Sequence, residues 1–238
     1  MRAYKSEPLP DEVVKALEEK IAQLNREGQL HMQLILNEPR AFQSRMAKYG
    51  KFLGVNNYVI VAGQKADDLD ERVGYYGEDL VLFAQMLGLN TCWVGITYSK
   101  VPGTYVLDEG EKVACCISIG YGATQGKSHK TKTVEQVSNA NDITPSWFRK
   151  GVEAALLGPS AVHQQKFTFE YAGLKDGRHQ VRARRGHSLI GYTKMDLGIA
   201  KYHFEVGAGK DNFEWTTSST SIRSKNPTTR WSDIIKLK

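Results

Sequence analysis

Cysteine is scarce in this sequence, which has three cysteines in 238 residues and no C-x-x-C pair. An odd count without that spacing argues against a disulfide scaffold and against a zinc site, and it favours a reducing compartment. A chain of this length can bury a core without covalent cross-links. We therefore expect Cys115 and Cys116 to be core residues, and Cys92 to be a packing residue at the end of an apolar helix.

Long apolar runs are missing as well. The N-terminal "MRAYKSEPLPDE" has no apolar signal region, and the most apolar stretch, "LVLFAQMLGL", is too short and too interrupted to span a bilayer. We expect a soluble, cytoplasmic protein with no membrane partner.

Most of the chain has no run of charges of one sign. The formal net charge is +6, but basic residues are interspersed with acids except at 178–185 and near the C-terminus. Such clusters are more often a solvated face or an anion site than a nucleic-acid surface. We expect no nucleic-acid partner.

Several catalytic signatures are also absent. "GYGATQG" has the wrong glycine spacing for a dinucleotide fingerprint and no apolar helix after it. Ser160 and His163 have neither an orienting acid nearby nor a nucleophile elbow, which argues against a hydrolase. Metal-binding spacing is missing at five histidines: His31, His129, His179, His187 and His203.

The first half of the chain alternates helical and strand patterns. An amphipathic helix is predicted over 9–24, a second helical stretch around 41–53, and a buried strand at "NYVIVAG". The segment "GEDLVLFAQMLGL", beginning at Gly77, is apolar almost all round and predicts a central helix. "KVACCISIGYG" predicts a further strand, and the polar run 126–142 could be a linker.

The second half begins with a helix capped at Thr144-Pro145, which Gly158-Pro159 ends. A short polar loop follows, then a strand at "KFTFEYAG", a mostly apolar helix at "MDLGIAKYHFEVGAG" and a strand at "FEWTTSSTSI". The stretch "LLGPSAVHQQKFTF" thus places a serine, a histidine and two glutamines between a buried helix and a strand.

The two halves share a pattern. The segments 77–88 and 198–209 have the same eleven-residue glycine spacing, and each follows a strand ending in Ala-Gly and precedes a tryptophan, Trp93 or Trp215. We predict two similar layers about a pseudo-twofold axis. The chain would then be one domain, 1–238, with halves at about 1–126 and 143–238.

Three segments carry a family resemblance. "GYYGEDLVLFAQMLGLNTCWVG", "ALLGPSAVHQQKF" and "MDLGIAKYHFEVGAG", in that order, resemble the nitroreductase family of FMN-dependent oxidoreductases. They are most similar to the branch in which one chain resembles the whole two-subunit dimer. The resemblance runs from Arg2 to about Trp215, and it implies an α+β fold with a sheet between helical layers.

The resemblance also implies a flavin site. In the family, a Pro-Ser-x-x-Asn-x-Gln loop holds part of FMN, which needs polar partners, cations for its phosphate and a flat apolar slot for its ring. The residues that match this loop lie in the second half only: Pro159, Ser160, Ala161, His163 and Gln165.

The other implied parts lie nearer the N-terminus. Arg2 matches the family's N-terminal cation beside the flavin's pyrimidine edge, and Tyr76 and Gly77 match the segment whose backbone approaches flavin N5. Lys130 and Lys132 match the basic run that binds the phosphate. One site per chain, shared between the two halves, would follow.

Simpler interpretations stay open for these residues. The two lysines could belong to a solvated linker, Ser160 could begin a turn, and Arg2 lies where a chain ordinarily frays. His163 stands where the family has asparagine, and it titrates. The first Arg and the Ser of the family's N-terminal motif are missing, so either the start is truncated or phosphate binding depends on the lysines.

The resemblance implies an FMN-dependent NAD(P)H oxidoreductase without catalytic side chains. NAD(P)H would reduce FMN by hydride transfer, and a small-molecule acceptor such as a nitroaromatic or a quinone would reoxidise it. The chain could act as a monomeric pseudo-dimer. Two alternatives remain: an FMN-binding protein without turnover, and a nucleic-acid or anion-binding module using Arg178, Arg182, Arg184 and Arg185.

Overall fold

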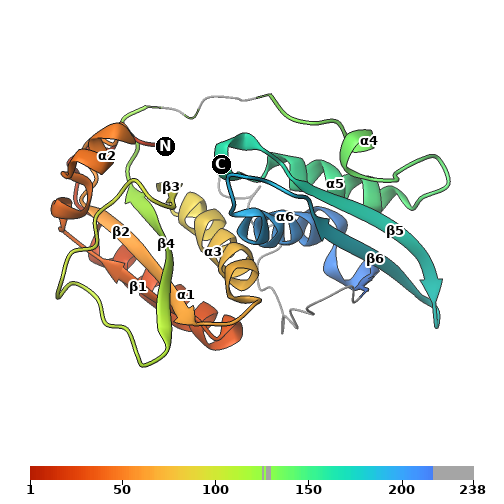
Figure 1. Cartoon of the computed structure of the whole chain (residues 1–238), viewed down its shortest axis with the longest axis horizontal. Helices are drawn as coiled ribbons and strands as arrows, with labels where there is room; N and C mark the ends of the chain where they lie inside the picture. The colour runs from red at the N-terminus through yellow and green to blue at the C-terminus, as the bar shows by residue number, and fades with distance from the viewer. Residues whose placement is uncertain (125, 127–129, 217–238) are drawn as a thin grey trace. The chain divides into compact units, whose positions relative to one another are not determined.

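The computed structural model describes residues 1–124, 126 and 130–216, which form two compact units (Figure 1). The first unit is Met1–Leu69 with Asp79–Lys127, and the second is Asp70–Glu78 with Ser128–Lys238. The division therefore does not simply separate the two halves of the sequence, because a nine-residue piece of the first half belongs to the second unit. The single domain with pseudo-repeated halves stays a prediction.

Helices of the first unit follow the expected pattern only in part. α1 (Asp11–Gly28) begins after Pro10 and has acids in its first turn, and it buries Leu17, Ile21 and Leu24 as predicted. The helix expected around 41–53 is wrong. The chain forms a 3₁₀ turn, η1 (Pro39–Phe42), and a five-residue helix, α2 (Arg45–Tyr49), because Lys51 and Gly54 have positive φ angles that no α-helix continues.

The sheet of the first unit has the order β1-β2-β4-β3, and every pair is antiparallel. The two predicted strands, β2 (Asn57–Gln64) and β4 (Glu111–Gly120), are its central strands, and Cys115 and Cys116 are buried on β4. The edge strands β1 (His31–Ile35) and β3 (Asn90–Val94) were not predicted. Cys92 lies in β3 and not at the end of a helix, so its expected position is wrong, but it packs against the core as expected.

The second unit packs two helices against a three-stranded sheet of order β5-β6-β7 (Figure 1). The predicted helix α5 (Ser146–Leu157) and strand β5 (Phe167–Lys175) are present. The basic cluster forms β6 (Arg178–Arg185), which pairs antiparallel with β5. Asp176 and Gly177, both at positive φ, connect the two strands, as a tight hairpin turn requires.

The remaining elements of this unit are shorter than predicted or differ in type. The expected linker contains α4 (Val134–Val137), whose Thr133 and Gln136 form a capping box, while 125 and 127–129 lie outside the described residues. Two 3₁₀ turns occur, η2 (Ala161–His163) and η3 (Lys210–Asn212). Of the predicted final strand, β7 (Glu214–Trp215) is described, and its residues from 217 onward lie outside the described part.

The two central helices approach closely within the second unit. α3 (Leu69–Met86) contributes residues 70–78, which lie against α6 (Thr193–Ala208). A Cβ added at Gly74 would be 2.0 Å from the Met195 carbonyl oxygen, and one added at Gly198 would be 2.0 Å from that of Glu71. The absence of a side chain at Gly74 and at Gly198 therefore allows the two helices to approach this closely.

Buried charged and polar side chains accompany this helix contact. Lys201 Nζ lies 2.9 Å from Glu71 Oε1, and His203 Nε2 lies 2.8 Å from Glu78 Oε1. All four residues are at most 8% exposed. Because an unpaired charge is costly to bury, each partner requires the other helix. Among the described residues, no helix has both the length and the apolar character needed to cross a membrane.

Candidate functional site

The loop after α5 has an unusual backbone. Gly158 ends the helix, Pro159 follows, and then Val162, His163 and Gln165 have φ angles of 46°, 57° and 43°. Residues with a side chain seldom adopt this left-handed conformation, and for a β-branched residue such as Val162 it is an outlier. Strain of this kind is found where a structure holds a functional segment in place.

Gln165 fastens this loop to its surroundings. Its side chain is 1% exposed, donates from Nε2 to the Leu156 carbonyl oxygen at 3.0 Å, and accepts from the Lys132 backbone N–H at 2.8 Å. The Lys132 ammonium donates to the Gln165 carbonyl oxygen at 2.6 Å. The Gln165 N–H in turn donates to Ser160 Oγ at 3.0 Å. The predicted glutamine therefore joins the basic segment, the end of α5 and the start of the loop.

Asp196, in the first turn of α6, holds the loop from the other side. Its Oδ1 accepts from the Ala161 N–H at 2.9 Å, and its Oδ2 accepts from Gln164 Nε2 at 2.7 Å. Asp196 is 2% exposed, and burial raises the pKa of its carboxyl above the ordinary value, although both hydrogen bonds oppose this.

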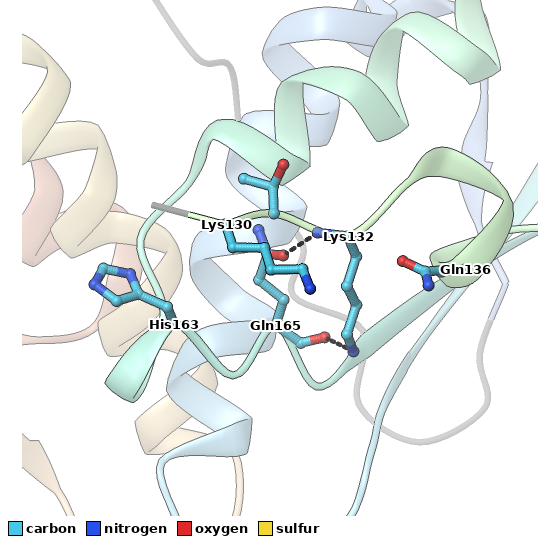
Figure 2. Close-up of a pocket in the computed structure, with 6 residues that line it drawn as sticks. Lys130, Lys132, Gln136, His163 and Gln165 are labelled. Carbon is cyan, nitrogen blue, oxygen red and sulfur yellow. Dashed lines mark hydrogen bonds between the residues drawn. The ribbon is translucent and has the colours of Figure 1, made fainter. Parts of the chain in front are cut away.

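These contacts leave a pocket of about 480 Å³ beside the loop (Figure 2). Its lining is polar and contains cations but no carboxylate: Lys130, Thr131, Lys132, Gln136, His163 and Gln165. Figure 2 shows Lys132 hydrogen-bonded to both the side-chain oxygen and the backbone carbonyl oxygen of Gln165. His163 lies at one edge of the pocket, and Gln136 on α4 lies at another. Desolvation by burial lowers the pKa of Lys132, and the nearby charge of Lys166 adds to this. The pocket is suited to an anion.

The structure brings four of the ten predicted site residues together in the lining of this pocket, namely Lys130, Lys132, His163 and Gln165. Pro159, Ser160 and Ala161 form the start of the same loop, where the Ser160 hydroxyl and the Ala161 N–H are engaged within the protein. Lys132 and Gln165 thus have a structural role in addition to lining the pocket.

Arg2 lies in the first unit, and its terminus is held in place. The Arg2 guanidinium donates to the Gly50 carbonyl oxygen at 3.1 Å and lies over the Phe52 ring. The Tyr4 N–H donates to the Leu53 carbonyl oxygen, and the N-terminal ammonium to that of Thr91. The terminus therefore does not fray as its position in the chain suggested. The flavin contact of Arg2 stays a prediction.

Tyr76 and Gly77 do not open a helix, and this part of the prediction is wrong. α3 begins at Leu69, seven residues before Tyr76, so both residues are in its interior. Backbone N–H groups in a helix interior donate to carbonyl oxygens four residues earlier. Tyr76 is 2% exposed and packs edge-on against Tyr75. The acids Asp70 and Glu71, typical of a first turn, were the overlooked signal of the true start.

The sequence matches a family model described as "Putative TM nitroreductase" over residues 1–208. The chain belongs to this nitroreductase family. A nitroreductase is an oxidoreductase, so the family description supports an oxidoreductase.

Solved structures resemble this nitroreductase-family chain in fold. A putative nitroreductase from Thermotoga maritima is 21% identical, with 87% of this chain and 78% of that one covered and a TM-score of 0.57. A putative nitroreductase from Desulfovibrio desulfuricans, in complex with FMN, is 18% identical, with 61% and 92% covered and a TM-score of 0.47. No curated protein sequence matches the chain. The first of these likenesses confirms the α+β class predicted for this member of the nitroreductase family.

Sequence reasoning missed Asp196, Gln164, Gln136 and Thr131. The first was a single acid in an apolar helical segment, "MDLGIAKYHF", and such an acid needs a buried partner. That signal was available, but the identity of the partner, 35 residues earlier in the chain, was not.

Proposed function

We propose that this chain is an FMN-dependent NAD(P)H oxidoreductase whose pocket at Lys130, Lys132, His163 and Gln165 holds the phosphate end of FMN. The supporting observation is that two segments matched to the family, 130–132 and 159–165, meet in one cationic pocket. Family membership supports the reaction class.

The residues fit one end of FMN. A lining made of polar and basic residues, two of them lysines, suits a phosphate and a polyhydroxyl chain, and the volume is in the range of small-ligand pockets. It does not suit a flat apolar ring. The ring would lie against apolar surface outside this lining. Leu157, just before the loop, and Val162, within it, offer such surface, because their side chains are 70% and 67% exposed.

The chain's own residues would bind and orient. Lys130 is exposed and has no hydrogen bond or ion pair to the described residues, so its ammonium is available to a phosphate oxygen. Lys132 is held by Gln165, and its pKa, lowered by burial, fits a cation that gains by pairing with an anion. Bound FMN would supply the hydride chemistry, with NAD(P)H as donor and a nitroaromatic or quinone-like small molecule as acceptor.

The nucleic-acid alternative has less support. Arg182 and Arg184 face Glu170, and Arg178 pairs with Glu214 at 3.1 Å, so these three arginines are paired with carboxylates across the strands. A surface for a polyanion would instead leave its cations unpaired.

An FMN titration followed by visible absorbance tests the proposal. Wild-type protein is expected to bind FMN, and anaerobic NADPH or NADH should bleach the bound flavin band. Lys130→Ala should weaken FMN binding on the order of tenfold or more, because a hydrogen bond to a charged group contributes roughly 1.5–3 kcal/mol.

Lys175→Ala is the matched control, because Lys175 ends β5 on the same unit and is exposed but does not line the pocket. It should bind FMN like the wild type. Equal affinity for the wild type and Lys130→Ala would place the phosphate elsewhere, and a wild type that binds no FMN would overturn the proposed function.

A further inference from the structure

The buried carboxylate of Asp196 does not serve its own helix. Acids in a first helical turn commonly interact with the free N–H groups of that turn. Both oxygens of Asp196 instead accept hydrogen bonds from the loop 35 and 32 residues earlier, at Ala161 and Gln164. A buried charge is costly, so its position under the loop needs an explanation.

The loop is the part of the unit that needs holding. Val162, His163 and Gln165 have positive φ angles, and Ala161 comes directly before them. Such residues are strained and persist only where surrounding contacts enforce the conformation. Asp196 holds the Ala161 N–H, just before these residues, and the side chain of Gln164, which lies among them.

Gln164 extends this contact to a second loop. Its Nε2 donates to Asp196 Oδ2 and also to the Gly191 carbonyl oxygen, at 3.1 Å. The segment around Gly191 carries two exposed apolar side chains, Leu189 at 97% and Ile190 at 56%. One carboxylate therefore connects the loop of the cationic pocket with an exposed apolar segment.

We propose that Asp196, acting through Ala161 and Gln164, is the positioning residue that holds the pocket loop in its left-handed form and couples it to residues 186–192. As a claim about ligand binding, this rests on the proposed function. It assigns Asp196 no contact with the ligand. Its effect on affinity arises because a loop that is already ordered does not lose conformational freedom on binding.

The test uses Asp196→Asn, which keeps the shape of the side chain but turns one acceptor atom into a donor. That donor either faces the Ala161 N–H, which loses its acceptor, or faces Gln164, whose Oε1 can accept only if Nε2 turns away from the Gly191 carbonyl oxygen. One contact of the loop is lost in either case. We expect FMN affinity on the order of tenfold weaker, as for the loss of one buried hydrogen bond. In the protein without FMN, hydrogen exchange at the Ala161 and Gln165 amides should become faster.

A compensating variant separates positioning from general destabilisation. In Asp196→Asn/Gln164→Glu, the new amide can donate to the new carboxylate while its oxygen still accepts from the Ala161 N–H. The double variant should recover the amide protection at Ala161 and part of the FMN affinity, because the carboxylate introduced at position 164 can no longer donate to the Gly191 carbonyl oxygen. Glu71→Gln is the control for the loss of a buried carboxylate in the same unit, because it removes the ion pair with Lys201 and leaves the loop intact. It should lower thermal stability with little change in FMN affinity.

The outcomes are distinguishable. If wild-type protein binds FMN and Asp196→Asn binds it equally well with unchanged exchange, the positioning role is overturned and the proposed function stands. If the wild type binds no FMN, the proposed function fails, and the exchange rates at Ala161 and Gln165 alone decide whether Asp196 holds the loop. Affinity that falls equally in Glu71→Gln and Asp196→Asn, without recovery in the double variant, would reduce Asp196 to a structural residue.

Discussion

Val162 is the residue at which local conformation and side-chain type disagree most. It is β-branched, its φ is 46°, and its side chain is 67% exposed, so little packing compensates for the conformation. A left-handed residue with a side chain costs roughly 1–2 kcal/mol, whereas glycine adds about 0.5–1 kcal/mol of backbone entropy cost. We expect Val162→Gly to raise the free energy of unfolding by about 0.5–1 kcal/mol and to weaken FMN binding by loosening the loop.

Urea unfolding of Val162→Gly measures the first effect, and an FMN titration measures the second. Ile143→Gly is a suitable control, because Ile143 is 91% exposed in a loop and does not have a positive φ. It should be no more stable than wild type. A Val162→Gly variant that loses stability would show that the valine side chain has packing that its exposure does not reveal.

The carboxyl of Asp196 predicts a pH dependence. Burial raises its folded-state pKa above the ordinary value of 3.8, so the folded protein binds this proton more tightly than the unfolded chain does. The resulting contribution to stability is complete below the ordinary pKa and is lost as pH rises through the raised one. Wild-type protein should therefore gain stability relative to Asp196→Asn as the pH is lowered from 7 to 4.

Urea midpoints of both proteins at several pH values check this, because other titrating groups cancel in the difference. A difference that stays constant from pH 7 to 4 would mean that the Asp196 carboxyl is not protonated more readily in the folded state.

The site residues that could be predicted from the sequence are those that lie in short segments resembling the family. Lys130, Lys132, His163 and Gln165 were chosen from their positions in segments that resemble the family, and they line one pocket. Their contact with FMN stays a prediction. Asp196 was not found, because its role exists only once α6 lies against the loop. The hydrogen bonds of the Gln165 side chain to Lys132 and Leu156 could not be predicted for the same reason.

The contact between α3 and α6 gives the strongest prediction at the scale of elements. A Cβ at Gly198 would lie 2.0 Å from the Glu71 carbonyl oxygen and 2.7 Å from the Tyr75 nitrogen, both of them backbone atoms of the facing helix. Only separation of the helices relieves such a clash, and separation would break the buried Lys201–Glu71 pair. We expect Gly198→Ala to cost about 3 kcal/mol or more.

Gly151→Ala provides the comparison, because there the new Cβ would meet only side chains, the Phe204 ring at 2.8 Å and the Ala208 methyl at 2.9 Å. The Phe204 ring can turn, and the Ala208 methyl needs only a small movement of its backbone, so the cost should be about 1–2 kcal/mol, less than that of Gly198→Ala. Urea unfolding of both variants gives the ranking. Equal stabilities for Gly198→Ala and wild type would mean that the helices do not approach so closely.

Elements were predictable where one pattern dominated. The helix at α5, the buried strands β2 and β4 and the alternating strand β5 have such patterns, and all were found. β6 was not, because four arginines concealed its alternation, although "KDGR" is a strong hairpin signal. The start of α3 was placed too late, because the polar turn from Leu69 to Gly74 does not share the apolar pattern that follows it.

At the scale of the whole molecule, the second unit is incomplete without a piece of the first half of the chain. Residues 70–78 provide three buried side chains that pair with α6: Glu71 with Lys201, Glu78 with His203, and Tyr75 with Glu205. Removing one partner of a buried charge pair typically costs about 3–5 kcal/mol, and a whole domain is stable by only about 5–15 kcal/mol.

We therefore expect a fragment of residues 128–238 to fail to fold cooperatively, because it lacks residues 70–78. Circular dichroism during urea unfolding should show a gradual change for the fragment and a sigmoidal one for the full chain. A peptide of residues 66–90 added in trans should restore some cooperativity, whereas the same peptide with Glu71→Ala and Glu78→Ala should not. A fragment that unfolds cooperatively by itself would show that the buried side chains of α6 find other partners and that residues 70–78 are not needed for this unit to fold.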